Sequence, residues 1–148
     1  MYENWIVSAA VVLGTVAVVI SCVLVHYEGL LQTSRVLSRL DVMPRAKVLL
    51  GILAIIALHV LEIWLFGLIM WSMLHWPECG FIKGADPLGV LDAVYFSAVT
   101  FSTVGFGDLT PVGPIRFMAA TEALTGFVLI TWSASFTFLD MERFWRKP

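Results

Sequence analysis

Residues 102–108 read STVGFGD, a segment with two glycines, a threonine and a carboxylate in a chain that is otherwise mostly apolar. Of the 148 residues, 59% are hydrophobic and only 14% are charged, and the mean hydropathy is +0.90. A soluble domain of this size needs more charged residues to cover its surface. The segment 102–108 therefore belongs to a membrane protein.

Three apolar runs are long enough to cross a bilayer as helices, since a span needs about 20 residues. They cover residues 5–25, 48–74 and 115–139. The residues before the first run carry no Lys or Arg, which favours a retained helix over a cleaved signal peptide. We predict an all-α membrane protein with three transmembrane helices.

The basic residues predict the orientation of the spans. Four lie in the segment 28–47 and three in the tail 141–148, whereas residues 75–114 carry one basic residue and four acidic ones. The positive-inside rule places 28–47 and the tail in the cytoplasm of a multi-pass cell-membrane protein, with the N-terminus and 75–114 outside. The basic residues are Arg35, Arg39, Arg45 and Lys47, then Arg143, Arg146 and Lys147.

The organisation along the chain follows from these spans. Residues 1–27 form an additional N-terminal helix, and 28–47 form a cytoplasmic linker. The linker alternates leucines with Arg35 and Arg39, which fits a short helix in the inner membrane interface or an ordinary loop. Residues 48–140 form a separate module.

Within that module, the outer segment divides into a loop and a short helix. Residues 75–89 are rich in Gly and Pro and read as a loop. Residues 90–102 are apolar but too short to cross, so we predict a re-entrant helix leading into 103–108. Pro111 and Pro114 then break the chain before the last span.

Irregular backbone at membrane depth is tolerated only where it is buried in protein or lines water. Gly105 and Gly107 permit positive φ angles, and alternating them with Val104 and Phe106 turns successive carbonyls to one side. Together with the Thr103 hydroxyl, such carbonyls make a surface of hard oxygen ligands suited to a bare alkali cation.

Residues 103–108, TVGFGD, resemble the selectivity filter of potassium channels, in the phenylalanine form found in two-pore-domain channels. The resemblance covers about two thirds of the chain, with 48–74 as the outer helix, 90–102 as the pore helix and 115–139 as the inner helix. It implies a homotetramer around one pore that conducts K⁺ passively. The filter residues it implies are Thr103, Val104, Gly105 and Phe106, whose carbonyls bind K⁺ with the Thr103 hydroxyl, and Gly107 and Asp108, which support them.

Other residues extend the resemblance. Tyr95 and Phe96 are similar to the aromatic pair that surrounds the filter, and Gly126 falls where many such channels carry a hinge glycine. Some members place a glutamate four residues before the filter threonine, where it bonds the filter aspartate. Here that position is Val99, so Asp108 needs another partner.

Ionisable residues inside the spans are costly and point to function by default. His59 and Glu62 share a face of the second span, and Glu122 lies on the third. Three interpretations stay open for these possible gating residues: a proton-sensitive cluster, a metal site, or a polar contact that only fixes the packing.

The sequence argues against several classes of function. No span carries arginines at every third position, so a voltage sensor is excluded. The sequence also lacks a basic patch that would indicate nucleic-acid binding. With no candidate nucleophile or substrate pocket, we expect no enzyme and no cofactor, only membrane lipids and permeating K⁺. Cys79 stands alone in the outer segment, which leaves open a disulfide between subunits. The alternatives to a K⁺ channel are a non-conducting pore-like subunit or sensor and a weakly selective cation channel.

Overall fold

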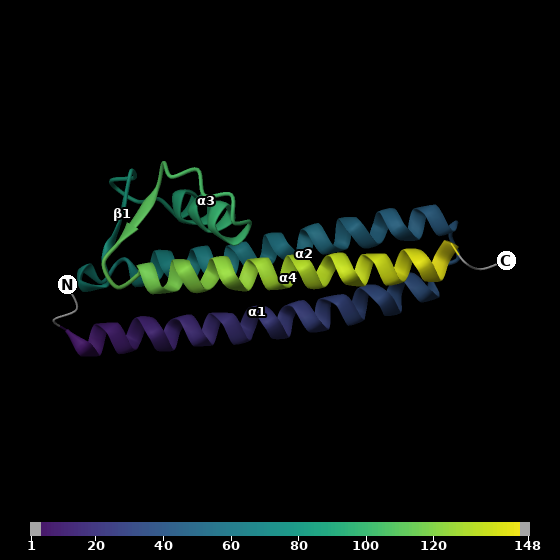
Figure 1. Cartoon of the computed structure of the whole chain (residues 1–148), viewed down its shortest axis with the longest axis horizontal. Helices are drawn as coiled ribbons and strands as arrows, with labels where there is room; N and C mark the ends of the chain where they lie inside the picture. The colour runs from purple at the N-terminus through teal and green to yellow at the C-terminus, as the bar shows by residue number, and fades with distance from the viewer. Residues whose placement is uncertain (1–3, 146–148) are drawn as a thin grey trace.

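The structure, a computed structural model, describes residues 4–145, with side chains through Glu142. Three long helices lie side by side, and a short helix and a two-stranded ribbon pack at one end (Figure 1). The elements in order are α1 (Trp5–Arg39), α2 (Pro44–Met73), a 3-10 turn η1 (Pro77–Cys79), β1 (Phe81–Lys83), α3 (Val90–Phe101), β2 (Thr110–Val112) and α4 (Arg116–Trp145).

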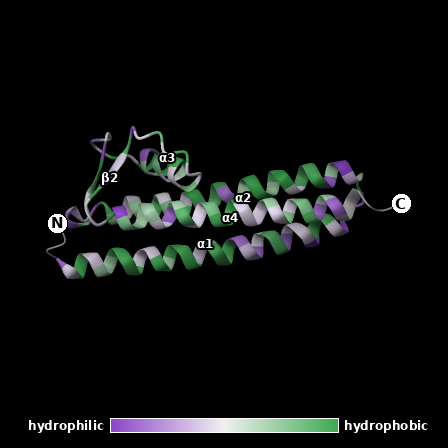
Figure 2. Cartoon of the chain, in the orientation of Figure 1, coloured by the Kyte–Doolittle hydropathy of each residue, from purple (hydrophilic) through white to green (hydrophobic). Residues whose placement is uncertain are grey.

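The long helices are membrane spans by length and composition. With 35, 30 and 30 residues, each extends beyond a hydrocarbon core of about 30 Å. All three contain an 18-residue stretch that is apolar enough for a span, and only 11% of that stretch in α2 is buried against the rest of the chain. Apolar residues cover most of their length (Figure 2). The predicted all-α membrane protein with three spans and a short helix before residues 103–108 is confirmed.

The first helix differs from the prediction. We expected a span over 5–25 and a separate linker over 28–47, but α1 continues without a break to Arg39. No proline interrupts residues 26–39, and the buried side chains of Leu30 and Leu37 continue the packing face of α1. The interfacial helix is therefore absent as a separate element, and only a short connection precedes Pro44, which occupies the first turn of α2.

The last helix also extends past its predicted end. We expected the inner helix over 115–139 and a tail over 141–148, but α4 runs to Trp145. The basic side chains predicted for the tail, Arg143, Arg146 and Lys147, lie outside the described side chains.

A ribbon that the sequence did not predict closes the segment between α2 and α4. β1 pairs antiparallel with β2, with Phe81 opposite Val112 and Lys83 opposite Thr110. The Asn4 side-chain amide donates to Glu78 Oε2 at 2.6 Å, which ties the start of α1 to the same end of the molecule. We call this end, formed by residues 75–114 and the start of α1, the hairpin end.

The core joins all four helices. Its largest fully buried side chains are those of Phe66, Phe101, Met70 and Ile115, and Val18 of α1 packs into the same cluster. The additional helix α1 is thus integrated with the other three.

Cys79 is buried, with 0% of its surface exposed, and its side chain packs near Val7 and Val11 of α1. Burial and the neighbouring Glu78 carboxylate raise the pKa of the Cys79 thiol. Both effects disfavour the reactive thiolate. The thiol therefore lies within its own chain and is not presented to a neighbouring subunit.

We expect Cys79 to react slowly with a membrane-impermeant maleimide in the folded protein. Phe81→Cys in a Cys79→Ala background is the control, because residue 81 is 57% exposed at the same end and should label rapidly. Rapid labelling of Cys79, or a spontaneous disulfide-linked dimer on a non-reducing gel, would contradict this account.

Candidate functional site

The backbone of residues 103–107 follows directly from the C-terminal end of α3. The Thr103 amide donates to the Thr100 carbonyl at 2.9 Å, and the Gly105 amide donates to the Val99 carbonyl at 3.0 Å. These two bonds fold the chain back beside α3. Residues 102–108 are all exposed in the single chain.

The φ angles alternate in sign along this segment. They are 60° at Thr103, 54° at Gly105 and 79° at Gly107, whereas Val104 and Phe106 have no positive φ. In an ordinary strand successive carbonyls point to opposite sides, and alternation between left-handed and right-handed residues brings them to one side. A threonine held at positive φ is strained, and such strain concentrates at functional sites.

The carbonyl oxygens of residues 103–106 have no partner within the described part of the chain. Within residues 4–145, no backbone or side-chain hydrogen bond reaches any of these four oxygens. Unpaired peptide oxygens are costly unless water, an ion or another chain satisfies them. The segment is thus a row of free acceptors at the end of a short apolar helix.

Asp108 has a different hydrogen-bond partner, as expected because position 99 is a valine and not a glutamate. The Tyr95 hydroxyl donates to Asp108 Oδ2 at 2.7 Å. This hydrogen bond lowers the pKa of the Asp108 carboxyl. The two members of the predicted aromatic pair therefore differ: Tyr95 braces Asp108, whereas Phe96 is 4% exposed and belongs to the core.

Gly126 of α4 lies directly against the end of α3. A Cβ atom at this position would stand 2.0 Å from the Phe101 carbonyl oxygen, a backbone atom that has no freedom to move away. The glycine is therefore required for close packing of α4 on α3. This requirement holds whether or not the predicted hinge operates.

One turn before Gly126, Glu122 of α4 contacts Ser97 of α3, which also contacts α2. The Ser97 hydroxyl lies 2.8 Å from the Ile63 carbonyl oxygen of α2 and also hydrogen-bonds Glu122 Oε1. A hydroxyl carries one hydrogen, so it cannot donate to two acceptors. Both contacts are satisfied if Glu122 is a neutral acid that donates to Ser97, while Ser97 donates to Ile63. A charge on the buried and unpartnered Glu122 Oε2 is thereby avoided.

The predicted trio of ionisable residues separates into two sites. His59 Nδ1 lies 2.9 Å from Glu62 Oε2, as their spacing indicated, but Glu122 is not part of this group. The third member is instead His26 of α1, whose Nδ1 lies 2.8 Å from Glu62 Oε1. His26 was missed because it falls just beyond the predicted span. A signal was present, since His26 continues the buried row of Val18 and Cys22 at intervals of four residues.

A family model described as an ion channel matches residues 58–142, which is more than half of the chain. This chain belongs to the ion-channel family. The match contains the second half of α2, α3, the segment 103–108 and most of α4. Helix α1 lies outside it, so the channel carries α1 in addition to the matched region.

Individual relatives match shorter parts of the channel. Protein LctB of Geobacillus stearothermophilus is 40% identical over 52 residues, which are 35% of this chain and 39% of the relative. The inward rectifier potassium channel Kirbac3.1 of Paramagnetospirillum magnetotacticum is 37% identical over 72 residues, 47% of this chain and 24% of the relative. Two-pore potassium channel 1 of Arabidopsis thaliana is 44% identical over 50 residues, 33% of this chain and 14% of the relative.

The channel thus spans well under half the length of these curated relatives, and no solved structure gives a significant match. The family resemblance that residues 103–108 indicated is confirmed by the family match and by the potassium channels among the relatives.

Replacing Tyr95 with Phe should raise the pH at which the channel loses activity in acid. A carboxyl whose pKa is lowered keeps its bond above that pKa and loses it as the pH falls through it. Without the Tyr95 hydroxyl, the Asp108 pKa returns towards its ordinary value, and protonation begins at a higher pH. Ion flux into liposomes measured against external pH tests this shift.

Tyr27→Phe is the matched control, because Tyr27 lies on α1 and is removed from Asp108. Identical acid profiles for Tyr95→Phe and the unmodified channel would show that the contact does not support the segment.

Ser97→Ala should destabilise the channel by about 1–3 kcal/mol, because it removes the hydrogen bond to the Ile63 carbonyl and leaves the Glu122 carboxyl without its partner. Glu122→Gln should cost much less, since the Gln amide donates to Ser97 as the neutral acid does. Thermal unfolding in detergent measures both, with the exposed Ser38→Ala as control. Equal losses for Glu122→Gln and Ser97→Ala would contradict the assignment of Glu122 as a neutral donor to Ser97.

Proposed function

We propose that this channel is selective for potassium, conducts it passively and works as a homotetramer. The observation that carries the proposal is the row of four unpartnered carbonyls at residues 103–106, set by the alternating φ angles. Four such rows around one axis, with the Thr103 hydroxyls, replace the hydration shell of a K⁺ ion. No cofactor is needed, because K⁺ is the permeating ion.

The exposure of this segment supports an assembly. Val104 is 57% exposed and Phe106 is 70% exposed in the single chain. Irregular backbone at membrane depth must be buried in protein or line a water-filled cavity. A tetramer meets both conditions, since neighbouring copies cover the side chains while the carbonyls face the central pore.

The position of α3 supports the same function. Its C-terminal end, at Phe101, adjoins the segment 103–107. The C-terminus of a helix carries a partial negative charge. In a tetramer, four such ends directed toward the axis favour a cation in the cavity below the filter.

The distribution of charges supports the proposed sidedness. Arg39 and Arg45 lie at the ends of α1 and α2 away from the hairpin end, where Glu78 and Asp108 lie. By the positive-inside rule, this distribution favours a hairpin end outside and an opposite end in the cytoplasm of the cell membrane.

The test is K⁺ and Na⁺ flux into liposomes for the unmodified chain and Gly105→Ala. Alanine at a φ of 54° is strained by about 1–2 kcal/mol, although no atom within 4 Å obstructs its Cβ in the single chain. We expect Ba²⁺-blocked K⁺ flux that exceeds Na⁺ flux in the unmodified channel, and loss of K⁺ flux in the variant while tetramers still form.

Gly89→Ala is the matched control, because Gly89 precedes α3 with an ordinary φ of −78°. Unchanged K⁺ flux in Gly105→Ala would refute the assigned filter. A folded tetramer without flux would favour a non-conducting subunit, and equal K⁺ and Na⁺ fluxes would favour a weakly selective cation channel.

A further inference from the structure

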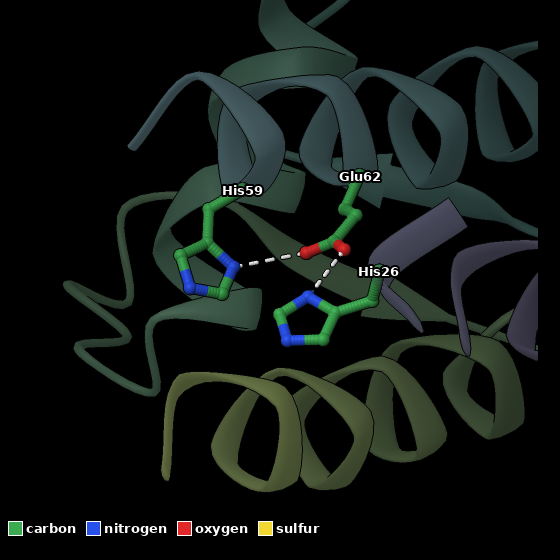
Figure 3. A group of neighbouring side chains, drawn as sticks. All are labelled: His26, His59 and Glu62. Carbon is green, nitrogen blue, oxygen red and sulfur yellow. Dashed lines mark hydrogen bonds and ion pairs between the residues drawn. The ribbon is translucent and has the colours of Figure 1, made fainter. Parts of the chain in front are cut away.

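Two histidines and a glutamate meet between α1 and α2, away from the segment 103–108. Figure 3 shows the Glu62 carboxylate between the two rings, with one oxygen toward His26 and the other toward His59. His26 and Glu62 are fully buried, and the His59 side chain is 16% exposed. We propose that His26, His59 and Glu62 bind a divalent transition-metal ion such as Zn²⁺.

The donor set and its spacing fit such an ion. One ligand atom from each residue lies within 4.8 Å of the other two. Two imidazole nitrogens and one carboxylate oxygen are typical protein ligands of Zn²⁺, and in a tetrahedral site they lie about 3.4 Å apart. The present contacts of 2.8 and 2.9 Å would therefore lengthen by about half an ångström. Binding at Nδ1 requires each neutral ring to carry its hydrogen on Nε2, so the two hydrogens now shared with the carboxylate shift to Nε2 and no net proton is released.

Neighbouring side chains already orient the ligands. His26 Nε2 lies 3.4 Å from the Ser133 hydroxyl of α4, so the ring nitrogen opposite the proposed metal has a polar neighbour. The Trp132 ring lies 5.2 Å from the His26 ring, and the Phe101 ring lies 5.8 Å from the His59 ring, centroid to centroid. Metal-bound histidines usually have such a contact at the second nitrogen, which fixes the ring and its tautomer.

The geometry also limits which ion would fit. Cys22 lies one turn before His26, but its thiol points toward the Glu62 backbone carbonyl at 4.0 Å and is not in the group of converging atoms. The set is therefore two nitrogens and one oxygen, which favours Zn²⁺, Co²⁺ or Ni²⁺ over Cu⁺. His26 and Glu62 are fully buried and His59 is 16% exposed, so a remaining coordination position would lie on the His59 side of the site.

A metal here would join α1 to α2 of the ion-channel module. His26 comes from α1, which lies outside the region matched by the family, and His59 and Glu62 come from within it. The proposed site is independent of potassium selectivity, and metal binding can be measured without ion flux.

The test is titration of the purified 148-residue chain in detergent with Co²⁺, followed by competition with Zn²⁺. We expect about one Co²⁺ per chain with the intense visible absorption of a tetrahedral site, displaced by Zn²⁺. His26→Gln and Glu62→Gln should each weaken binding by about 10-fold or more.

Two controls make the result specific. The chain has three histidines, and the third, His75, is exposed and hydrogen-bonds the Trp71 carbonyl, so His75→Gln should bind Co²⁺ unchanged. Cys22→Ala should also leave the spectrum unchanged. Loss of binding in His75→Gln would place the metal elsewhere and overturn the proposal.

A second measurement does not depend on variants that fold poorly. An ion that binds only the folded chain raises its unfolding temperature. Zn²⁺ should therefore stabilise the unmodified chain, and a chelator should reverse the shift. If the folded, unmodified chain neither binds Co²⁺ nor gains stability from Zn²⁺, the three residues form a hydrogen-bonded contact only and the proposal fails.

Discussion

A peptide carbonyl in a membrane must have a partner, and four consecutive carbonyls at residues 103–106 have none within the described chain. The surrounding structure keeps them in this costly state. Left-handed φ angles at Thr103, Gly105 and Gly107 hold the backbone, and the Gly105 amide is fastened to the last turn of α3. The backbone conformation thus keeps these four carbonyls unpaired within the described chain, and a partner has to come from outside it.

The conformation of residues 103–107 is held through α3, which packs against α2 and α4. The α4 helix meets the end of α3 at Gly126, where no side chain fits, and the Ser97 hydroxyl joins α2 and α4 to the middle of α3. Directly before Ile63 on α2, Glu62 links this helix to α1 through His26. His26, Glu62, Ser97 and Glu122 thus each contact a neighbouring helix, which fits the high cost of an isolated polar group in lipid.

Strong local patterns made much of this fold predictable. Long apolar runs identified the spans, and residues 103–108 identified the segment because few backbones need glycines in that alternation. The end of the apolar run at residue 25 does not predict the continuous α1, because a helix continues where no breaker occurs and where side chains such as Leu30 and Leu37 are buried. The pairing of His26 with Glu62, and of Glu122 with Ser97, depends on how helices rotate against one another, which no spacing within one helix reveals.

The pairing of β1 with β2 has a mechanical consequence. Lys83 lies opposite Thr110, so the two ends of the segment between these residues are held together by the β1–β2 pairing. A displacement of α2 or α4 along its axis acts on the paired strands β1 and β2 before it acts on residues 103–107. Motion of the long helices would then reach residues 103–107 through the surfaces that touch α3, because the paired strands restrain the covalent connection.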